Sequence, residues 1–149
     1  MKLFLVVDFQ KTLVDALPKD AASDLDKRIA ERVLSCRYNG TDVAFTLGSG
    51  DAVFGNTASR KLMCDMVFEK NSLPSLDLAD YLRQKEYSQV EICGIMSFGA
   101  VIANAVMVRS ALPGTEIIIN ESLISADDEK LHREALDIMR AMGFTVIQS

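Results

Sequence analysis

The sequence predicts a three-layer α/β/α fold with helices on both faces of a mostly parallel sheet, and three observations predict it. Segments typical of strands alternate with segments typical of helices along the whole chain. Most of the predicted strands are continuous apolar runs, which is typical of parallel strands covered on both faces. The 149 residues are 49% hydrophobic and 25% charged. That size and composition are typical of one globular domain, so we expect a single domain over residues 1–149.

The chain opens with a predicted strand followed by a predicted helix. Residues 2–8 (KLFLVVD) are a short apolar run ending in an acid, which is typical of a buried strand. Residues 24–38 carry apolar side chains on one helix face and charges on the other. The apolar positions are Leu25, Ile29, Val33 and Leu34. Gly40 ends this helix, because glycine tolerates the left-handed conformation found after many helices.

Short strands and a glycine-rich loop come next. Residues 43–46 predict a second strand, and residues 66–69 predict a third, shorter one. Between them, residues 47–57 (LGSGDAVFGNT) predict a loop. A helix is expected to begin at Ser75, with Asp77 in its first turn, because a serine caps a helix and an acid there complements the helix dipole.

The rest of the chain predicts three strands and two helices. Residues 90–95 (VEICGI) are a strand, and residues 99–112 are a nearly apolar helix that we expect to be covered on most sides. A strand over residues 116–120, an amphipathic helix over residues 127–142 and a last strand over residues 145–147 follow. The side chains of the last helix expected to face inward are Leu131, Ala135, Ile138, Met139 and Met142.

Charge and cysteine content exclude several classes of protein. The chain has 16 Lys+Arg against 21 Asp+Glu, a net charge of −5, which argues against binding nucleic acid or an anionic membrane. No segment has the roughly 18–20 apolar residues that span a bilayer. The three cysteines form no Cys-x-x-Cys pair, so we expect a reducing, cytoplasmic location. The single histidine, His132, excludes a His-rich zinc site and is expected on a solvated helix face.

Three places fall where predicted strands end, and parallel sheets bind ligands there. Asp8 is either a turn residue or a carboxylate that acts as a general base. Lys70 is either a solvated surface group or part of the same site. Residues 94–101 form a strand-to-helix turn, which either directs backbone N–H groups at an anion or is a helix start capped by Ser97. Phosphate-loop motifs and Gly-x-Ser-x-Gly are absent.

Several segments together resemble the isochorismatase-like cysteine hydrolases, a family that includes nicotinamidases. LFLVVDFQ is similar to the family's opening strand, and FEKNSL with LADYL is similar to its lysine segment and the following helix. EICGIMSFGAVIANA resembles the nucleophile region in layout, and the tail around His132 resembles the closing helix. The resemblance covers nearly the whole chain and implies a Rossmann-like topology.

The family's mechanism uses an Asp, a Lys and a Cys that attacks an electrophilic carbon. The resemblance implies that Asp8 is the base for the thiol and that Lys70 is the cation that supports thiolate and base. Ala100 then stands at the nucleophile position. The resemblance also implies a cis peptide bond between Ile95 and Met96, and oxyanion donors in the amides of Met96 and Ala100.

Other expectations concern the pocket, the metal and the partners. Phe9 and Phe98 are candidate pocket walls, with ordinary core packing the alternative for both, and Asn71 is a further candidate contact. Nicotinamidase-type members carry an Asp–His–His metal site near residues 47–66, where this chain has no histidine, so we expect neither metal nor cofactor. The expected ligand is a small molecule. The resemblance implies a homodimer or higher homo-oligomer, to which residues 99–112 contribute.

Ala100 leaves the function open, because a methyl group cannot attack a carbon. The first hypothesis is a hydrolase scaffold for C–N (amide-type) or related bonds in a small metabolite, inactive as written, whether the cysteine was replaced by design or naturally. The alternative is a natural pseudoenzyme that binds or sequesters a small molecule, with nicotinamide- and nucleotide-derived compounds as candidates. A weaker option is a structural subunit of an active relative. Among the cysteines, Cys64 is the least implausible substitute nucleophile.

Overall fold

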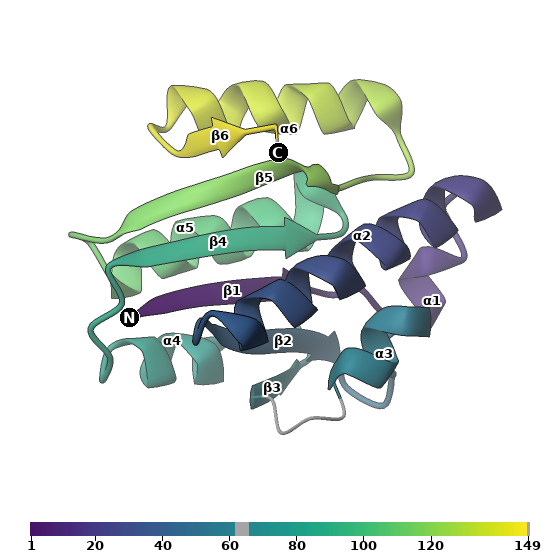
Figure 1. The fold of residues 1–149 in the computed structure, drawn as a ribbon. Coiled ribbons are helices and arrows are strands. Elements are labelled where there is room, and N and C mark those ends of the chain that lie inside the picture. The colour runs from purple at the N-terminus through teal and green to yellow at the C-terminus, as the bar shows by residue number, and fades with distance from the viewer. Residues whose placement is uncertain (62–65, 149) are drawn as a thin grey trace.

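The computed structural model describes residues 1–61 and 66–148 and contains one six-stranded sheet with helices on both faces (Figure 1). The sheet order is β3-β2-β1-β4-β5-β6, and all neighbouring strands are parallel. The predicted α/β/α class is therefore confirmed. The strands are β1 (Lys2–Val7), β2 (Asp42–Gly48), β3 (Met66–Lys70), β4 (Gln89–Gly94), β5 (Glu116–Ile124) and β6 (Thr145–Ile147).

The helices lie in front of and behind this sheet, and Figure 1 shows α2 in front with α4 and α5 behind. They are α1 (Lys11–Val14), α2 (Lys19–Tyr38), α3 (Gly55–Lys61), α4 (Leu76–Leu82), the π-helical turn η1 (Ser97–Val101), α5 (Ile102–Ala111) and α6 (Glu129–Ala141). The N-cap residues of α4 and α6 cap these helices with their own side chains, since Ser75 accepts from the Leu78 amide and Asp128 from the Leu131 amide. None of the described helices combines the length and apolar character needed to cross a bilayer.

The strand order places a topological switch point between β1 and β4. From β1 the chain proceeds through β2 to β3 on one side, and from β4 it proceeds through β5 to β6 on the other. Because right-handed crossovers run in opposite directions on the two sides of this point, α2 and α3 lie together on one face of the sheet and α4 and α5 lie together on the other. Strand β1 lies in the core, and its residues 3–7 are at most 1% exposed. A crevice at the carboxyl ends of β1 and β4 is where this topology binds ligands.

Two helices were not predicted, and both depend on contacts distant in sequence. The short α1 follows Asp8, and α3 occupies the end of the predicted loop over residues 47–57. The start of α3 is held by Asp26 of α2, whose carboxylate accepts hydrogen bonds from the amides of Asn56 and Thr57 at 2.8 Å each. Because that carboxylate comes from 30 residues upstream, local periodicity does not reveal the helix.

Some predicted boundaries were also wrong. Helix α2 begins at Lys19 rather than at residue 24, directly after Pro18, a residue that suits a helix start. Strand β5 extends to Ile124 rather than to residue 120. The predicted helix over residues 99–112 begins as the π-helical turn η1, with a break in helical conformation at Gly99.

The buried face of α6 is narrower than predicted. Ala135 and Met139 are buried as expected, but Leu131, Ile138 and Met142 are 38%, 50% and 43% exposed. Helix α6 lies along the β5–β6 edge of the sheet (Figure 1), where β6 has only three residues. A short edge strand covers less of a helix's apolar stripe than the centre of a sheet does. Part of the apolar stripe of α6 therefore stays exposed.

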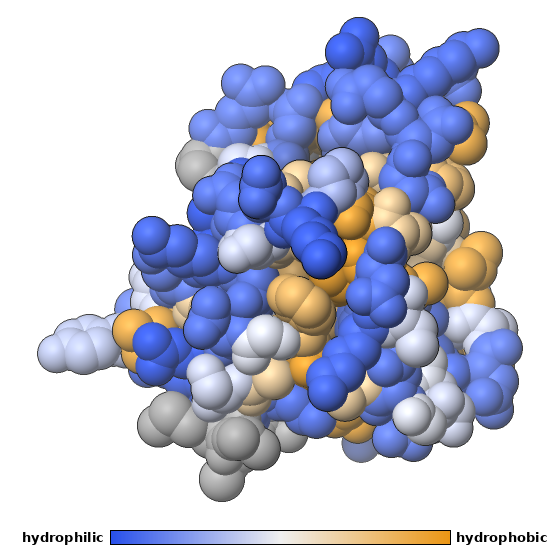
Figure 2. Space-filling view, turned by 90° about the vertical axis from the view of Figure 1, so that its right-hand side faces the viewer, coloured by the Kyte–Doolittle hydropathy of each residue, from blue (hydrophilic) through white to orange (hydrophobic). Residues whose placement is uncertain are grey.

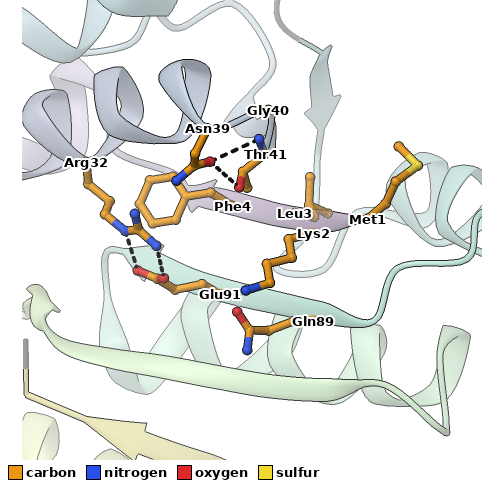
Figure 3. A pocket seen from close by; sticks show the side chains of 10 residues that line it. All are labelled: Met1, Lys2, Leu3, Phe4, Arg32, Asn39, Gly40, Thr41, Gln89 and Glu91. Atoms are coloured by element: carbon orange, nitrogen blue, oxygen red, sulfur yellow. Dashed lines mark hydrogen bonds and ion pairs between the residues drawn. The ribbon is translucent and has the colours of Figure 1, made fainter.

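A cavity of about 420 Å³ opens at the amino ends of the strands (Figure 3). The Arg32 guanidinium lies over the Phe4 ring and donates to both carboxylate oxygens of Glu91, at 3.1 and 2.6 Å. Asn120 also donates to Glu91, at 3.0 Å. Arg32 and Glu91, which line this cavity, are thus paired with each other within the chain, and the cavity lies at the opposite end of the sheet from Asp8.

Candidate active site

The candidate site lies at the carboxyl ends of the strands, the edge at the right of Figure 1. Asp8 follows β1 directly, Lys70 is the last residue of β3, and residues 95–100 follow β4. Figure 2 faces this edge and shows hydrophobic residues at its centre, between hydrophilic ones. The strand order therefore brings the three predicted places to one edge of the sheet, although they are far apart in sequence.

Asp8 and Lys70 form a buried ion pair. Lys70 Nζ is 2.7 Å from Asp8 Oδ2, and each side chain is only 6% exposed. The second carboxylate oxygen accepts from Thr46 Oγ1 at 2.8 Å, and Lys70 Nζ also donates to the Ser72 carbonyl at 2.8 Å. Asp8 has a left-handed backbone conformation, with φ of 48°, which non-glycine residues rarely adopt outside functional sites and turns.

Burial sets the proton affinity of Asp8. Desolvation raises the pKa of the Asp8 carboxyl, and the hydrogen bonds from Lys70 and Thr46 only partly offset that effect. A carboxylate with a raised pKa is a stronger proton acceptor than an ordinary aspartate. Lys70, in direct contact, keeps a positive charge beside any anion formed there. The pair can therefore take up a proton while stabilising a negative charge nearby.

The turn after β4 has an unusual backbone and close contacts with β1. Gly94 has φ of 118°, and the peptide bond between Ile95 and Met96 is cis. The Ile95 amide donates to the Val7 carbonyl at 3.0 Å, which links the turn to the residue preceding Asp8. Ala100 lies within η1 and is 3% exposed. The turn and Asp8 thus follow two strands that are hydrogen-bonded neighbours.

The other predicted pocket residues differ in their surroundings. Phe9 is 1% exposed and packs edge-to-face on Phe54, with ring centroids 5.8 Å apart, so core packing accounts for it. Phe98 is 37% exposed at the strand-end edge, where it can contact a ligand. Asn71 is exposed and lines, with Lys70, a cavity of about 230 Å³. Cys64 lies outside the described residues.

The sequence did not reveal several polar partners of this site. Thr46 at the end of β2 and Ser72 after β3 both contact the ion pair. Asn104 in α5 is fully buried and donates to the Ala100 carbonyl at 2.8 Å. The available signal was a polar side chain inside an otherwise apolar segment, because such a group needs a hydrogen-bonding partner once it is buried.

His132 was expected on a solvated surface, and this was wrong. The ring is half-buried, and its Nδ1 lies 2.8 Å from the Oγ of Ser97, which is itself fully buried. Burial lowers the pKa of His132, and the charges of Glu129 and Glu121, which act in the opposite direction, do not offset it. Arg133 adds to the lowering. The histidine therefore connects α6 to the turn after β4 in its neutral form.

This lowered pKa predicts a loss of stability in mild acid. Above about pH 6.5 neither the folded nor the unfolded chain protonates His132. As the pH falls below that value, the unfolded chain binds the proton first, so the folded state loses stability until the pH falls through the lowered folded pKa. Melting curves at pH 7.5 and 5.5 should show a larger fall in Tm for the unmodified chain than for His132→Asn. An equal fall in both would contradict the prediction.

The described residues do not fit a metal site of the nicotinamidase type. Within residues 1–61 and 66–148, no three His, Cys, Asp or Glu side chains come together in a way that could hold a metal ion. Asp51, in the loop after β2, accepts hydrogen bonds from Gln10 Nε2 at 2.8 Å and from the Thr12 hydroxyl. The only histidine, His132, contacts Ser97 after β4, whereas Asp51 follows β2, on the other side of β1 in the sheet. The side chains of Asp51 and His132 thus have hydrogen-bonding partners within the protein.

Comparisons with known proteins identify the fold. No family profile and no curated protein matches the sequence. A nicotinamidase from Staphylococcus aureus matches with a TM-score of 0.84 and 19% identity, over 99% of this chain and 97% of the other. An isochorismatase-like hydrolase from Alkaliphilus metalliredigens matches with 0.82 and 12%, over 99% and 94%. A ribonuclease from Caenorhabditis elegans matches with 0.79 and 15%, over 99% and 76%. At these identities the likeness concerns the fold, and function has to be argued from the site.

Proposed function

We propose that the chain belongs to the isochorismatase-like cysteine hydrolases. Its architecture is that of a hydrolase that cleaves C–N (amide-type) or related bonds in a small molecule. The observation that carries this proposal is the buried Asp8–Lys70 pair at the switch point, next to the turn after β4 in which position 100 lies. A likeness in fold to a nicotinamidase and an isochorismatase-like hydrolase supports it. The ribonuclease of the same fold is a weaker guide, because the net charge of −5 disfavours a nucleic-acid substrate.

Each residue of the site has a role in the proposed chemistry. A thiol at position 100 would lose its proton to Asp8, and the thiolate would attack the carbonyl carbon of an amide. The amides of Met96 and Ala100 would stabilise the oxyanion. The C–N bond then breaks, the amine leaves with the proton from Asp8, and water hydrolyses the thioester. Lys70 stabilises the negative charge throughout.

With alanine at position 100, none of these covalent steps takes place. The methyl group provides no electron pair, so a ligand would bind next to Asp8 and Lys70 and leave unchanged. We therefore propose that the chain as written is a binding protein with the architecture of a hydrolase, whether the cysteine was replaced by design or lost naturally.

The alternative proposal, a natural pseudoenzyme that sequesters a small molecule, has a specific observation in its favour. Asp8, Lys70 and Thr46 satisfy one another's polar groups inside the core. Removing one member of a buried ion pair is costly even where no reaction occurs. Folding alone can therefore retain the pair after a nucleophile is lost.

The ligand proposal predicts that small amides bind at the edge formed by Phe98. In titration calorimetry of the unmodified chain with nicotinamide, benzamide and acetamide, we expect the aromatic amides to bind, because Phe98 offers apolar area. Phe98→Ala should weaken binding by about five- to tenfold, which corresponds to roughly 1 kcal/mol of lost contact.

The matched control for this experiment is Leu34→Ala. Leu34 is 41% exposed, close to the 37% of Phe98, but it lies near the end of α2 that precedes β2, at the amino ends of the strands and away from the strand-end site. Its truncation should leave the affinity unchanged. If no amide binds, or if both variants weaken binding equally, the ligand proposal is wrong.

A further inference from the structure

We infer that Asn104 is a positioning residue that holds position 100 in register with the Asp8–Lys70 pair. Asn104 lies in α5 and is 0% exposed. Its Nδ2 donates to the carbonyls of Ala100, at 2.8 Å, and Leu73, at 3.0 Å, and its Oδ1 accepts from the Ser75 amide at 3.2 Å. This role rests on the proposed function, since it concerns the geometry of that same site.

The bonds of Asn104 complete a continuous path between the two halves of the site. Leu73 and Ser75 belong to the segment directly after β3, and the Ser72 carbonyl in that segment accepts from Lys70 Nζ at 2.8 Å. Lys70 in turn contacts Asp8 at 2.7 Å. One side chain therefore links the backbone of position 100 to the segment that holds the lysine.

The sheet by itself does not provide this link. In the order β3-β2-β1-β4, two strands separate the end of β3 from the end of β4, so no ladder hydrogen bond joins the Lys70 segment to the turn after β4. Helix α4 packs against both β3 and α5, but among the described hydrogen bonds none joins it to the turn after β4. An apolar side chain at position 104 would fill the space but leave the Leu73 carbonyl and the Ser75 amide without this partner.

The opposite side of the turn offers a matched comparison. Ser97 makes a partly buried hydrogen bond to His132 of α6, and no described hydrogen bond joins His132 to the Lys70 segment. Ser97→Ala therefore removes one polar contact from the same turn without cutting the path to Lys70. Comparing the two positions separates a specific link from general loosening of the turn.

The experiment measures thiol alkylation in the Ala100→Cys background, with iodoacetamide between pH 5 and 9. Asn104→Leu should raise the pKa of the introduced thiol and slow its alkylation at pH 7 about tenfold, since the stabilising cation is no longer held in place. Asn104→Thr should behave like Asn104→Leu, because threonine donates to the carbonyl four residues back but cannot reach the Lys70 segment. Ser97→Ala should change the rate less than about twofold, because it leaves the hydrogen bonds from Asn104 to position 100 and to the Lys70 segment intact.

Two results would overturn the inference: no effect of Asn104→Leu, or equal effects of Asn104→Leu and Ser97→Ala. An ordinary thiol in Ala100→Cys alone would instead count against the proposed function. If that thiol is ordinary, amide hydrogen exchange of the chain that keeps Ala100 still tests the inference. Asn104→Leu should speed exchange both in residues 72–75 and in residues 96–101, whereas Ser97→Ala should do so only in residues 96–101. Exchange confined to α5 in Asn104→Leu would contradict the link.

Discussion

Ala100→Cys is expected to create a thiol that ionises well below the ordinary range of cysteine. A cysteine beside a lysine and a basic carboxylate has its pKa lowered, and the thiolate is the reactive form. We expect alkylation by iodoacetamide at pH 6 to be at least about tenfold faster than for an unperturbed thiol. The same variant should release ammonia from those amides that the unmodified chain binds. Mass spectrometry of the modified peptides measures the first effect and an ammonia assay the second.

The background for this measurement is low, because the described cysteines are poor nucleophiles. Burial raises the pKa of Cys36 to about 11 and raises that of Cys93 well above its ordinary value. Cys64 lies on a different peptide from position 100, so peptide mapping separates it. Adding Lys70→Met to Ala100→Cys should slow alkylation about tenfold or more, since the cation is lost. A fast thiol that is indifferent to Lys70 would show that another group activates it.

Gly94→Ala is expected to unfold the protein or to cost more than about 4 kcal/mol of folding free energy, a loss seen only for severe steric or polar conflicts. A Cβ at Gly94 would lie 1.9 Å from the Val7 carbonyl oxygen, and that oxygen belongs to the strand at the centre of the sheet. The φ of 118° at Gly94 is itself unfavourable for a residue with a side chain. Urea unfolding followed by circular dichroism measures the loss.

Gly143→Ala is the matched control, because Gly143 also has a positive φ, of 87°. A Cβ there meets nothing within 4 Å, so only the backbone strain remains, about 1–2 kcal/mol. A loss at Gly94 no larger than that at Gly143 would show that β1 and β4 can separate at their ends. In that case the close approach of the turn to Asp8 would not be a fixed feature of the site.

Much of the site could be located from sequence, because ends of apolar runs are visible locally. Asp8 and Lys70 were singled out because each follows a predicted strand, and both lie at the carboxyl edge of the sheet. The same reasoning could not foresee Thr46 or Ser72 as partners. Hydrogen bonds between segments distant in sequence depend on strand order and register, which periodicity does not report.

The errors have the same cause. Leu131 and His132 are consecutive residues of α6. Leu131 was expected to face inward but is 38% exposed, and His132 was expected in solvent but is half-buried against Ser97. Amphipathic spacing shows that a helix has an apolar face but not how wide a surface the sheet offers to it. The helix α3 was missed because its first turn is held by Asp26, which belongs to another helix.

By itself, the sequence determined the parallel α/β architecture, the positions of most strands, and the identity of the residue at position 100. Continuous apolar runs, helical spacing and terminal glycines are local properties, so they can be recognised without knowledge of the fold. Only the tertiary structure decided that Lys70 contacts Asp8, that both are buried, and that Asn104 is hydrogen-bonded both to position 100 and to the segment after Lys70. Those facts depend on the order β3-β2-β1-β4, which brings residues 62 positions apart into contact and excludes water from between them.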